Sequence, residues 1–377
     1  MLYIVATAFF VTLISTSAVK HVAIKLGAVT APRERDVHTK PIPRLGGIAM
    51  FLGMAAAILV ARFTVYSQAL ENNDYQLFYF VLGAGLLVLV GAIDDVIDMD
   101  WMLKLAGQIG AALLVTHGGI QILSIPIFGT TVGSSKASVA VTVFLIVAVM
   151  NAVNFIDGLD GLAAGVAGIS ASAMYFYARI AGSDFLSSPV VALLIAGVTV
   201  GICLGFLPHN FNPAKIFMGD SGSMLLGYML ACSSIVIAGS IESAHIVSLK
   251  TLPTYIPILL VLALLFYPLL DMFMAVTRRL ARGKSPFSPD KKHIHHRILD
   301  LGHSQRMSAL LLYMWTALFS YCSLLILIMR FRYVMLIFAI GFVILVLATF
   351  LLPEIGWTAA DKARKIRDNK VKPKLKK

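Results

Sequence analysis

The side chains best suited to chemistry in this 377-residue chain lie in the stretch from Asn151 to Gly161. Two amides, Asn151 and Asn154, and two carboxylates, Asp157 and Asp160, fall here between apolar runs that carry almost no charge. Amide and carboxylate oxygens are the ligands that hard divalent cations prefer. The stretch therefore predicts a metal-binding or catalytic site. A polar turn between two helices is the alternative, because Asn, Asp and Gly are also typical turn residues.

Two further groups of carboxylates and amides have the same setting at the ends of apolar runs. Asp94 and Asp95 are adjacent, and adjacent carboxylates cannot both be buried and ionised without a cation or a shared proton. The other group extends from His209 to Asp220. For a single Asp, a helix-end or turn role is the simpler interpretation. The set as a whole favours Mg²⁺, with Mn²⁺ as an option, since such ions bind one or two carboxylates and then substrate phosphates.

A fourth cluster combines histidines with basic residues: Lys291, Lys292, His293, His295, His296 and Arg297. No cysteine or fourth metal ligand lies nearby, so the cluster indicates a cradle for a phosphate group more than a zinc site. A solvated basic loop is the remaining alternative, although three histidines within four positions are unusual for such a loop.

Hydrophobic residues make up 59% of the chain and charged residues 13%, whereas a soluble domain carries about 25% charged residues. This composition predicts a polytopic protein of the lipid bilayer and excludes an ordinary nucleic-acid-binding domain, despite the net charge of +12. The positive charge is concentrated in a few connections and the tail, which indicates an anionic leaflet and anionic substrates. The three cysteines lie inside apolar runs and predict no disulfide framework.

Apolar runs long enough to cross about 30 Å of hydrocarbon predict an all-α protein with about eleven transmembrane helices. The predicted spans are 1–19, 46–66, 77–93, 103–117, 137–153, 162–180, 189–207, 222–240, 253–276, 308–329 and 333–352. The first run lacks the basic start of a signal peptide, so we expect it to remain as a helix. We expect residues 1–352 to form a single integral-membrane catalytic domain, and residues 353–377 to form a basic cytoplasmic tail.

The distribution of Lys and Arg predicts the orientation of the spans. Basic residues are concentrated in the connections 20–44 and 277–307 and in the tail, while Arg330 and Arg332 are exceptions. With an odd number of spans these segments lie in the cytoplasm and the N-terminus lies outside. All four polar clusters then share the cytoplasmic face, which predicts one composite site on a helical scaffold. A transporter is the main alternative, but transporters carry ionisable groups mid-membrane, where these spans are nearly free of charge.

These motifs resemble those of the polyprenyl-phosphate N-acetylhexosamine-1-phosphate transferases over nearly the whole chain. The matching patterns are Lys40-Pro-Ile-Pro43-Arg44-Leu-Gly46-Gly47, Asp94-Asp95 followed by Trp101, Lys104 and Gln108, Asn151 to Gly161, Asn212 to Ser223, and Pro289 to Arg297. The last pattern is most similar to that of bacterial undecaprenyl-phosphate N-acetylglucosamine-1-phosphate transferases. The related muramoyl-pentapeptide transferases have three consecutive histidines there, which Ile294 interrupts in this chain.

The resemblance implies transfer of GlcNAc-1-phosphate from UDP-GlcNAc to undecaprenyl phosphate, giving GlcNAc-diphospho-undecaprenol and UMP. The reaction would take place at the cytoplasmic face of the plasma membrane and begin the synthesis of a cell-surface polysaccharide such as teichoic acid or O-antigen. Another UDP-N-acetyl sugar, including UDP-MurNAc-pentapeptide, is the alternative substrate. The sequence also leaves a homodimer open.

The resemblance also implies roles for individual residues. Two would bind Mg²⁺: Asp220 and Asn154. Four carboxylates would form the catalytic group: Asp94, Asp95, Asp157 and Asp160. Either of the first two would accept the proton of the lipid phosphate, and the other two would organise the metal or the nucleotide. The substrate-binding residues would be Arg44, Lys104, Asn151, Lys215, His293, His295, His296 and Arg297. Of these, Lys104 would pair with the lipid phosphate, and the histidines with Arg297 would hold the sugar-phosphate part.

Overall fold

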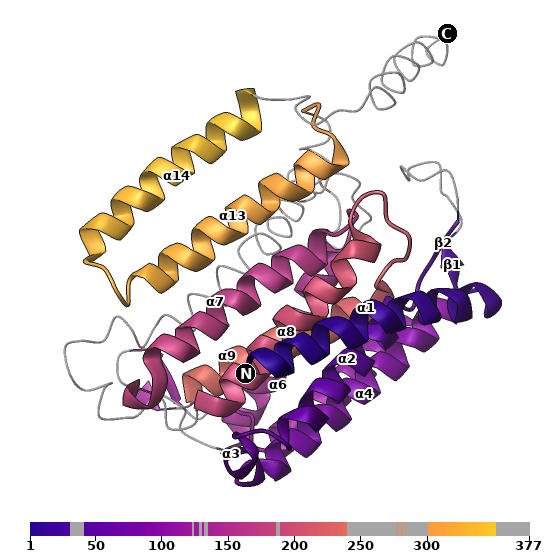
Figure 1. Cartoon of the computed structure of the whole chain (residues 1–377), viewed down its shortest axis with the longest axis horizontal. Coiled ribbons are helices and arrows are strands. Elements are labelled where there is room, and N and C mark those ends of the chain that lie inside the picture. The colour runs from indigo at the N-terminus through magenta and orange to yellow at the C-terminus, as the bar shows by residue number, and fades with distance from the viewer. Residues whose placement is uncertain are drawn as a thin grey trace.

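The computed structural model describes residues 1–30, 41–122, 124–127, 130–131, 135–185, 189–239 and 301–351, with Thr277, Leu280 and Gly283 besides. These residues form an all-α bundle with two short antiparallel ribbons (Figure 1). The longer helices are α1 (Leu2–Lys25), α2 (Gly46–Ala61), α4 (Asp74–Ile97), α5 (Trp101–His117), α6 (Ser135–Ile156), α7 (Leu162–Phe185), α8 (Pro189–Asn210), α9 (Gly219–Gly239), α13 (Gln305–Leu325) and α14 (Phe331–Leu351). The short elements are α3 (Ser67–Glu71) and the paired strands β1 (Val29–Thr30) with β2 (Ile42–Pro43) and β3 (Ser124–Ile127) with β4 (Thr130–Thr131).

Ten of the eleven predicted spans coincide with helices, and the eleventh, 253–276, lies outside the described residues. Seven described helices are long and apolar enough to cross a membrane: α1, α4, α6, α8, α9, α13 and α14. The prediction of an all-α polytopic membrane protein is therefore confirmed. Three predicted ends differ from the helices by five or six residues: α1 extends to Lys25 instead of 19, α7 extends to Phe185 instead of 180, and α2 ends at Ala61 instead of 66. The backbone bonds tighten there to the i→i−3 type, and the Thr64 hydroxyl donates to the Ala61 carbonyl at 2.7 Å.

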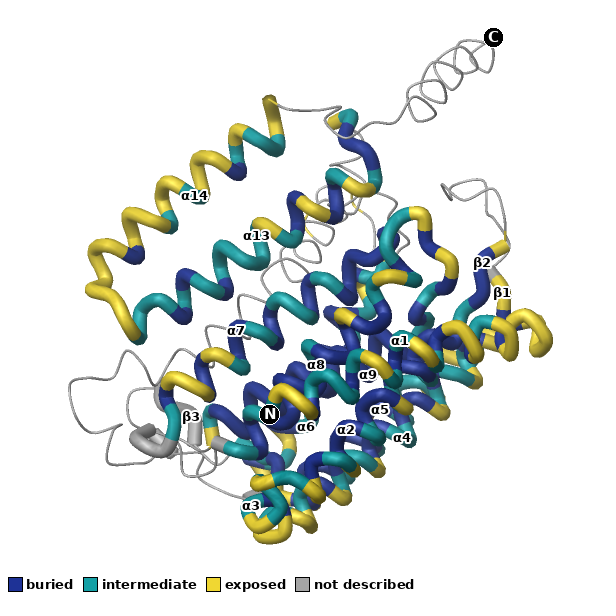
Figure 2. Tube along the Cα trace, in the orientation of Figure 1, coloured by how far each residue is buried: buried dark blue, intermediate teal, exposed yellow. Residues whose placement is uncertain are grey.

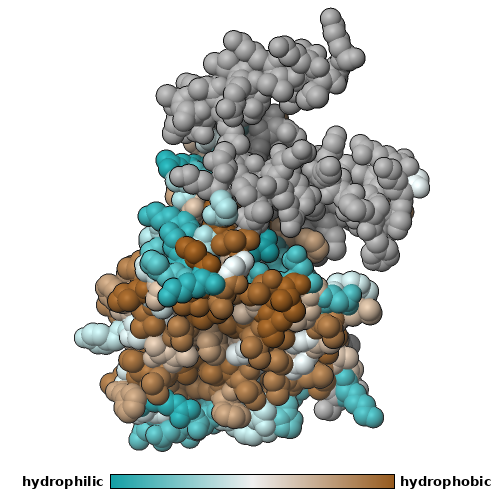
Figure 3. Space-filling model, turned by 90° about the vertical axis from the view of Figure 1, so that its right-hand side faces the viewer, coloured by the Kyte–Doolittle hydropathy of each residue, from teal (hydrophilic) through white to brown (hydrophobic). Residues whose placement is uncertain are grey.

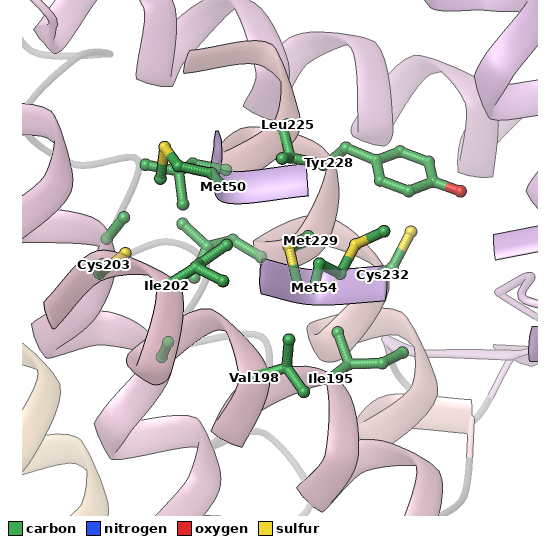
Figure 4. Close-up of a cluster of buried hydrophobic side chains, with 14 of the residues drawn as sticks. Met50, Met54, Ile195, Val198, Ile202, Cys203, Leu225, Tyr228, Met229 and Cys232 are labelled. Carbon is green, nitrogen blue, oxygen red and sulfur yellow. The ribbon is translucent and has the colours of Figure 1, made fainter. Parts of the chain in front are cut away.

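Helix α9 is the centre of the bundle. Its apolar span is 89% buried and packs against α2, α4, α6, α7 and α8, whereas the span of α14 is 17% buried. The exposed residues of α14 appear in yellow in Figure 2. Met50 and Met54 of α2, Ile202 of α8, and Leu225 and Met229 of α9 meet in the core shown in Figure 4. The buried centre of the molecule thus includes the helix whose first turn carries Asp220.

On the face shown in Figure 3, apolar side chains form a broad band across the bundle, with hydrophilic side chains above and below it. One end contains the N-terminus, where the ammonium group of Met1 donates to the Tyr66 hydroxyl at 3.4 Å. The connection between α2 and α4 lies at this end too, and Arg62 pairs there with Asp74. Such a band is the surface that the hydrocarbon of a bilayer requires.

The opposite end contains the connections 98–100, 157–161 and 211–218. The end of α14 is also here, because His303, just before α13, lies 2.8 Å from the carbonyl of Thr349. Helices that alternate between the two ends therefore gather these connections, which are far apart in the sequence, into one polar region.

Candidate active site

Asp220, the second residue of α9, is the centre of a polar cluster built from four helices. Lys104 of α5 donates to Asp220 and also, at 3.1 Å, to Asp94 of α4. Asn154 of α6 donates through Nδ2 to Asp220 Oδ1 at 3.0 Å. Three of the four polar clusters of the sequence thus meet at one end of the bundle, which confirms that part of the prediction.

The turn between α4 and α5 brings Lys104 back to Asp94. Asp98 ends α4 in the left-handed conformation, with φ of 49°. Asp100 then caps α5, and its carboxylate accepts a backbone N–H of the first turn at 2.8 Å, as acidic N-cap residues do. The Met99 N–H donates to Asp94 Oδ1 at 2.7 Å. This tight reversal fixes the carboxylate and leaves its second oxygen for the lysine.

Asp95 faces a different partner, the N-terminus of α9. Its Oδ1 accepts the Asp220 N–H at 2.9 Å, and its Oδ2 accepts the Ser221 N–H at 3.3 Å and the Ser221 hydroxyl at 3.0 Å. A carboxylate is favourable there because the first N–H groups of a helix are unpaired and carry partial positive charge. Gly219 has a φ of +69°, and a Cβ on it would lie 2.2 Å from the Asp95 carboxylate. Asp95 therefore acts on the cluster by holding Asp220 in place.

One carboxylate oxygen of Asp160 likewise accepts hydrogen bonds from another segment, the connection 211–218. Its Oδ2 accepts the Asn212 side-chain N–H at 2.9 Å and the Ala214 backbone N–H at 3.0 Å. The carboxylate is buried. Asp160 thus ties the connection 157–161 to the connection 211–218, and these two segments form one wall of the site.

Helix α13 supports this wall, and nothing in the sequence indicated that role. The Tyr313 hydroxyl donates to the Gly161 carbonyl, and Arg306 Nε donates to the Asn212 carbonyl at 2.9 Å. The ring of Tyr313 also covers Gly165, where a Cβ would lie 2.0 Å from the ring. A single tyrosine in an apolar helix has no local feature that distinguishes it from an ordinary core residue.

Asp157 differs from the other carboxylates of the cluster. No hydrogen-bond partner of its side chain is found among the described residues, and the side chain is half-buried. Burial, and after it the negative charges of Asp220 and Asp95, raise the pKa of Asp157 to about 7, while the positive charge of Arg44 opposes the shift. The protonated form of this carboxyl group is therefore favoured more strongly than that of an ordinary aspartate. A cation placed beside it would favour its ionised form.

The predicted substrate-binding residues have different positions. Arg44 lies between β2 and α2, and the Phe217 N–H joins this segment to the site by donating to the Pro43 carbonyl at 2.8 Å. Lys215 is exposed on the connection 211–218. Asn151 lies deeper in α6, where its amide bonds with the amide of Gln108. The predicted residues of the basic loop lie outside the described residues: His293, His295, His296 and Arg297.

The donor set fits Mg²⁺. Within the described residues, no three His, Cys, Asp or Glu side chains form a ready-made metal site. Mg²⁺ does not need one, because it usually takes one or two carboxylates and completes its octahedron with water and substrate phosphates. Asp220 supplies a carboxylate, and the amide of Asn154 supplies an oxygen after a simple flip. Several carboxylates surround the single ammonium group of Lys104, so an added cation would also balance charge.

Comparisons with known proteins agree with the family resemblance of the sequence motifs. A family model described as glycosyl transferase family 4 matches residues 77–238. The decaprenyl-phosphate N-acetylglucosaminephosphotransferase of Mycolicibacterium smegmatis is 40% identical over 330 residues, which cover 84% of this chain and 79% of that protein. The protein of the same name from Mycobacterium tuberculosis is 41% identical, with 84% and 80% covered. A probable undecaprenyl-phosphate N-acetylglucosaminyl 1-phosphate transferase of Bacillus subtilis is 33% identical, with 84% and 83% covered. The chain belongs to the polyprenyl-phosphate N-acetylhexosamine-1-phosphate transferase family.

Proposed function

We propose that this protein transfers GlcNAc-1-phosphate from UDP-GlcNAc to a polyprenyl phosphate and releases UMP. The observation that supports this most strongly is the Asp94–Lys104–Asp220–Asn154 cluster at one end of an apolar bundle. It combines one cation with carboxylates at the boundary of the apolar band. The relatives are named for this transfer to decaprenyl or undecaprenyl phosphate. Both acceptors have the same phosphate group, so the same residues serve either chain length.

The chemistry requires positioning and charge neutralisation more than covalent help. An oxygen of the lipid phosphate forms a bond to the sugar-bearing phosphorus, and the bond from that phosphorus to the oxygen of UMP breaks. Lys104 pairs with the lipid phosphate and brings its oxygen into line. Asp94 holds the lysine and accepts a proton where the phosphate still carries one, although a phosphate monoester is mostly ionised near neutral pH.

Asp220 and Asn154 hold Mg²⁺ in this proposal, with Mn²⁺ as a substitute. An ion held there would supply charge neutralisation for the pyrophosphate and for the UMP leaving group. Arg44, Lys215, His293, His295, His296 and Arg297 bind the nucleotide-sugar. Asp157 and Asp160 serve this side of the site, Asp160 by fixing the wall and Asp157 by its carboxylate, which has no hydrogen-bond partner among the described residues.

The test uses purified protein with a panel of UDP-sugars and with C50 and C55 polyprenyl phosphates. UDP-GlcNAc should release UMP fastest and give a lipid whose mass is that of GlcNAc-diphospho-polyprenol. EDTA should abolish turnover, and Mg²⁺ should restore it. Faster turnover of another UDP-N-acetyl sugar, such as UDP-MurNAc-pentapeptide, would replace the proposed donor. The absence of any lipid-linked product would overturn the transferase assignment. Light scattering on the same sample measures the oligomeric state, and a homodimer remains a prediction.

The orientation is part of the proposal: the site faces the cytoplasm from the plasma membrane, and the tail 353–377 is cytoplasmic. The N-terminus and the site lie at opposite ends of the bundle, which supports this arrangement. A single cysteine placed at Ser134 should react with an impermeant reagent in intact cells, and one at Lys370 should react only after lysis. The native cysteines are buried and provide a low background. Labelling of Lys370→Cys in intact cells would reverse the orientation.

A further inference from the structure

A pair of amides lies beneath the cluster. Asn151 Nδ2 donates to Gln108 Oε1 at 2.8 Å and to the Val147 carbonyl at 2.8 Å. Gln108 Nε2 faces Asn151 Oδ1 at 3.5 Å and the sulfur of Met224 at 3.2 Å. Gln108 is 1% exposed. Both amide nitrogens therefore have two partners inside the protein, and neither is left to donate to a substrate.

The pair joins three of the four helices that the cluster joins, one turn deeper. Gln108 follows Lys104 by four residues on α5, and Met224 follows Asp220 by four residues on α9. Asn151 comes three residues before Asn154 on α6. Residues three or four apart lie on the same face of a helix. The three helices are thus connected at two levels, a lower level of amides and an upper level of charged groups.

The two levels differ in what a substrate does to them. In the upper level Lys104 is bonded to Asp220, and this bond has to be given up when the lysine pairs with an acceptor phosphate. The lower level offers no free donor to a substrate, because both amide nitrogens are already bonded within the protein and Gln108 is buried. Helices in a bilayer also lack a hydrophobic driving force toward one another, so packing and interhelical hydrogen bonds set their positions.

We propose that the Gln108–Asn151 pair is a positioning device that keeps α5, α6 and α9 in register while Lys104 exchanges Asp220 for the lipid phosphate. This inference rests on the proposed function. It gives Asn151 a positioning role in place of the substrate-binding role that the resemblance implied. A displacement of about 1 Å at a catalytic group can cost on the order of a hundredfold in rate. Loss of the Gln108–Asn151 pair should therefore lower turnover before it unfolds the protein.

A double-mutant cycle tests the pair. Gln108→Leu and Asn151→Leu should each lower kcat about tenfold, and the double variant should lower it by about the same factor instead of the hundredfold product, because either change removes one shared device. The KM for UDP-GlcNAc should change by less than about twofold in all three variants. Thr116→Val is the matched control, because Thr116 is also buried on α5 but donates only to Ala112 of its own helix.

Exchange of the two residues provides a rescue. Gln108→Asn combined with Asn151→Gln keeps both amides and the total side-chain length, and it should recover more than half of the wild-type kcat. Multiplicative effects of the two leucine substitutions, or a rise in the KM for UDP-GlcNAc limited to Asn151→Leu, would overturn the inference in favour of a substrate contact. The same cycle read by thermal unfolding needs no turnover. Absence of transfer by the wild type would therefore reject the proposed function, while coupling in unfolding would still report on the pair.

Discussion

Helix α4 carries an ion pair near each of its ends, and the two pairs have opposite environments. Asp74, at the start of the helix, pairs with Arg62, and the side chains are 54% and 46% exposed. Asp94, near its end, pairs with Lys104, and these side chains are 12% and 21% exposed. The same kind of interaction is thus solvated at one end and enclosed at the other.

The difference indicates which end does chemistry. Exposed pairs contribute about 0–1 kcal/mol, since water stabilises the separated charges nearly as well. Enclosing charged groups costs free energy unless geometry and further hydrogen bonds compensate. In the enclosed pair, Lys104 also donates to a second carboxylate, that of Asp220. Such an arrangement indicates binding or catalysis and not a contribution to stability, so substitutions at the two ends of α4 should separate the two roles.

The largest expected effect comes from Asp220→Asn. The protein should fold, but kcat should fall by about a thousandfold or more, because one full charge is lost from a sparse Mg²⁺ ligand set. Asp74→Asn is the matched control at the other end and should stay within about twofold of wild type. UMP release at increasing Mg²⁺ concentrations measures both. Near wild-type turnover and Mg²⁺ dependence in Asp220→Asn would show that Asp220 is not the ligand.

Lys104→Ala should act mainly on the lipid substrate. Loss of a charge-assisted hydrogen bond of about 1.5–3 kcal/mol should raise the KM for the polyprenyl phosphate by one to two orders of magnitude. Lys136→Ala, at the exposed start of α6, is the control and should leave both KM values unchanged. In contrast, His295→Ala and Arg297→Ala should impair the use of UDP-GlcNAc. If Lys104→Ala weakens UDP-GlcNAc binding and spares the lipid KM, this division has to be abandoned.

Substitutions of Asp95 test whether its carboxylate caps the N-terminus of α9 or accepts a proton in the reaction. An asparagine at this position can still accept the Asp220 N–H, so Asp95→Asn should keep about a tenth of the activity. Asp95→Ala should lose more, because the loss of an N-cap costs about 0.5–2 kcal/mol and allows α9 to shift. Ser221→Ala should show a milder loss with an unchanged pH profile. Equal inactivity of Asp95→Asn and Asp95→Ala at normal unfolding temperature would instead identify Asp95 as the proton acceptor.

Hydropathy was sufficient to predict most of the helices, because a span in lipid has to satisfy its backbone internally and present apolar side chains. Because successive spans cross in opposite directions, their order then predicted that the polar connections lie at one end of the bundle. The partners inside the site could not be predicted in this way. Asp94 and Asp95 look alike in the sequence, but adjacent helical residues point about 100° apart. One carboxylate therefore faces Lys104 and the other faces Ser221, which is 126 residues away.

The contribution of α13 was also beyond the sequence. Tyr313 reaches the Gly161 carbonyl only because α13 packs against α7. Its position in an apolar helix gives no local signal for this long-range contact. The predicted role of Asn151 shows the same limit, since a motif identifies a residue type but not the partner that occupies its side chain.

Asp157→Asn should stabilise the protein while it impairs activity. Because the folded pKa of Asp157 is about 7, the ionised carboxylate is disfavoured in the folded state. The contribution of Asp157 to wild-type stability therefore falls as pH rises from the unfolded pKa near 4 to about 7 and is constant above that. In metal-free buffer the unfolding temperature of Asp157→Asn should exceed that of wild type by a few degrees at pH 8 and by less at pH 5. An equal difference at both pH values would contradict the assignment.

The smallest effect should come from the exposed pair. Arg62→Ala, Asp74→Ala and the double variant should each change the unfolding temperature by less than about 2 °C, because an exposed pair contributes at most about 1 kcal/mol and a protein of this size shifts little per kcal/mol. Turnover should remain within about twofold of wild type. Raising the salt concentration should remove any residual difference, since exposed charges are screened. A loss of activity comparable to that of Lys104→Ala would mean that the two ends of α4 are coupled, and the contrast between them would no longer identify the active end.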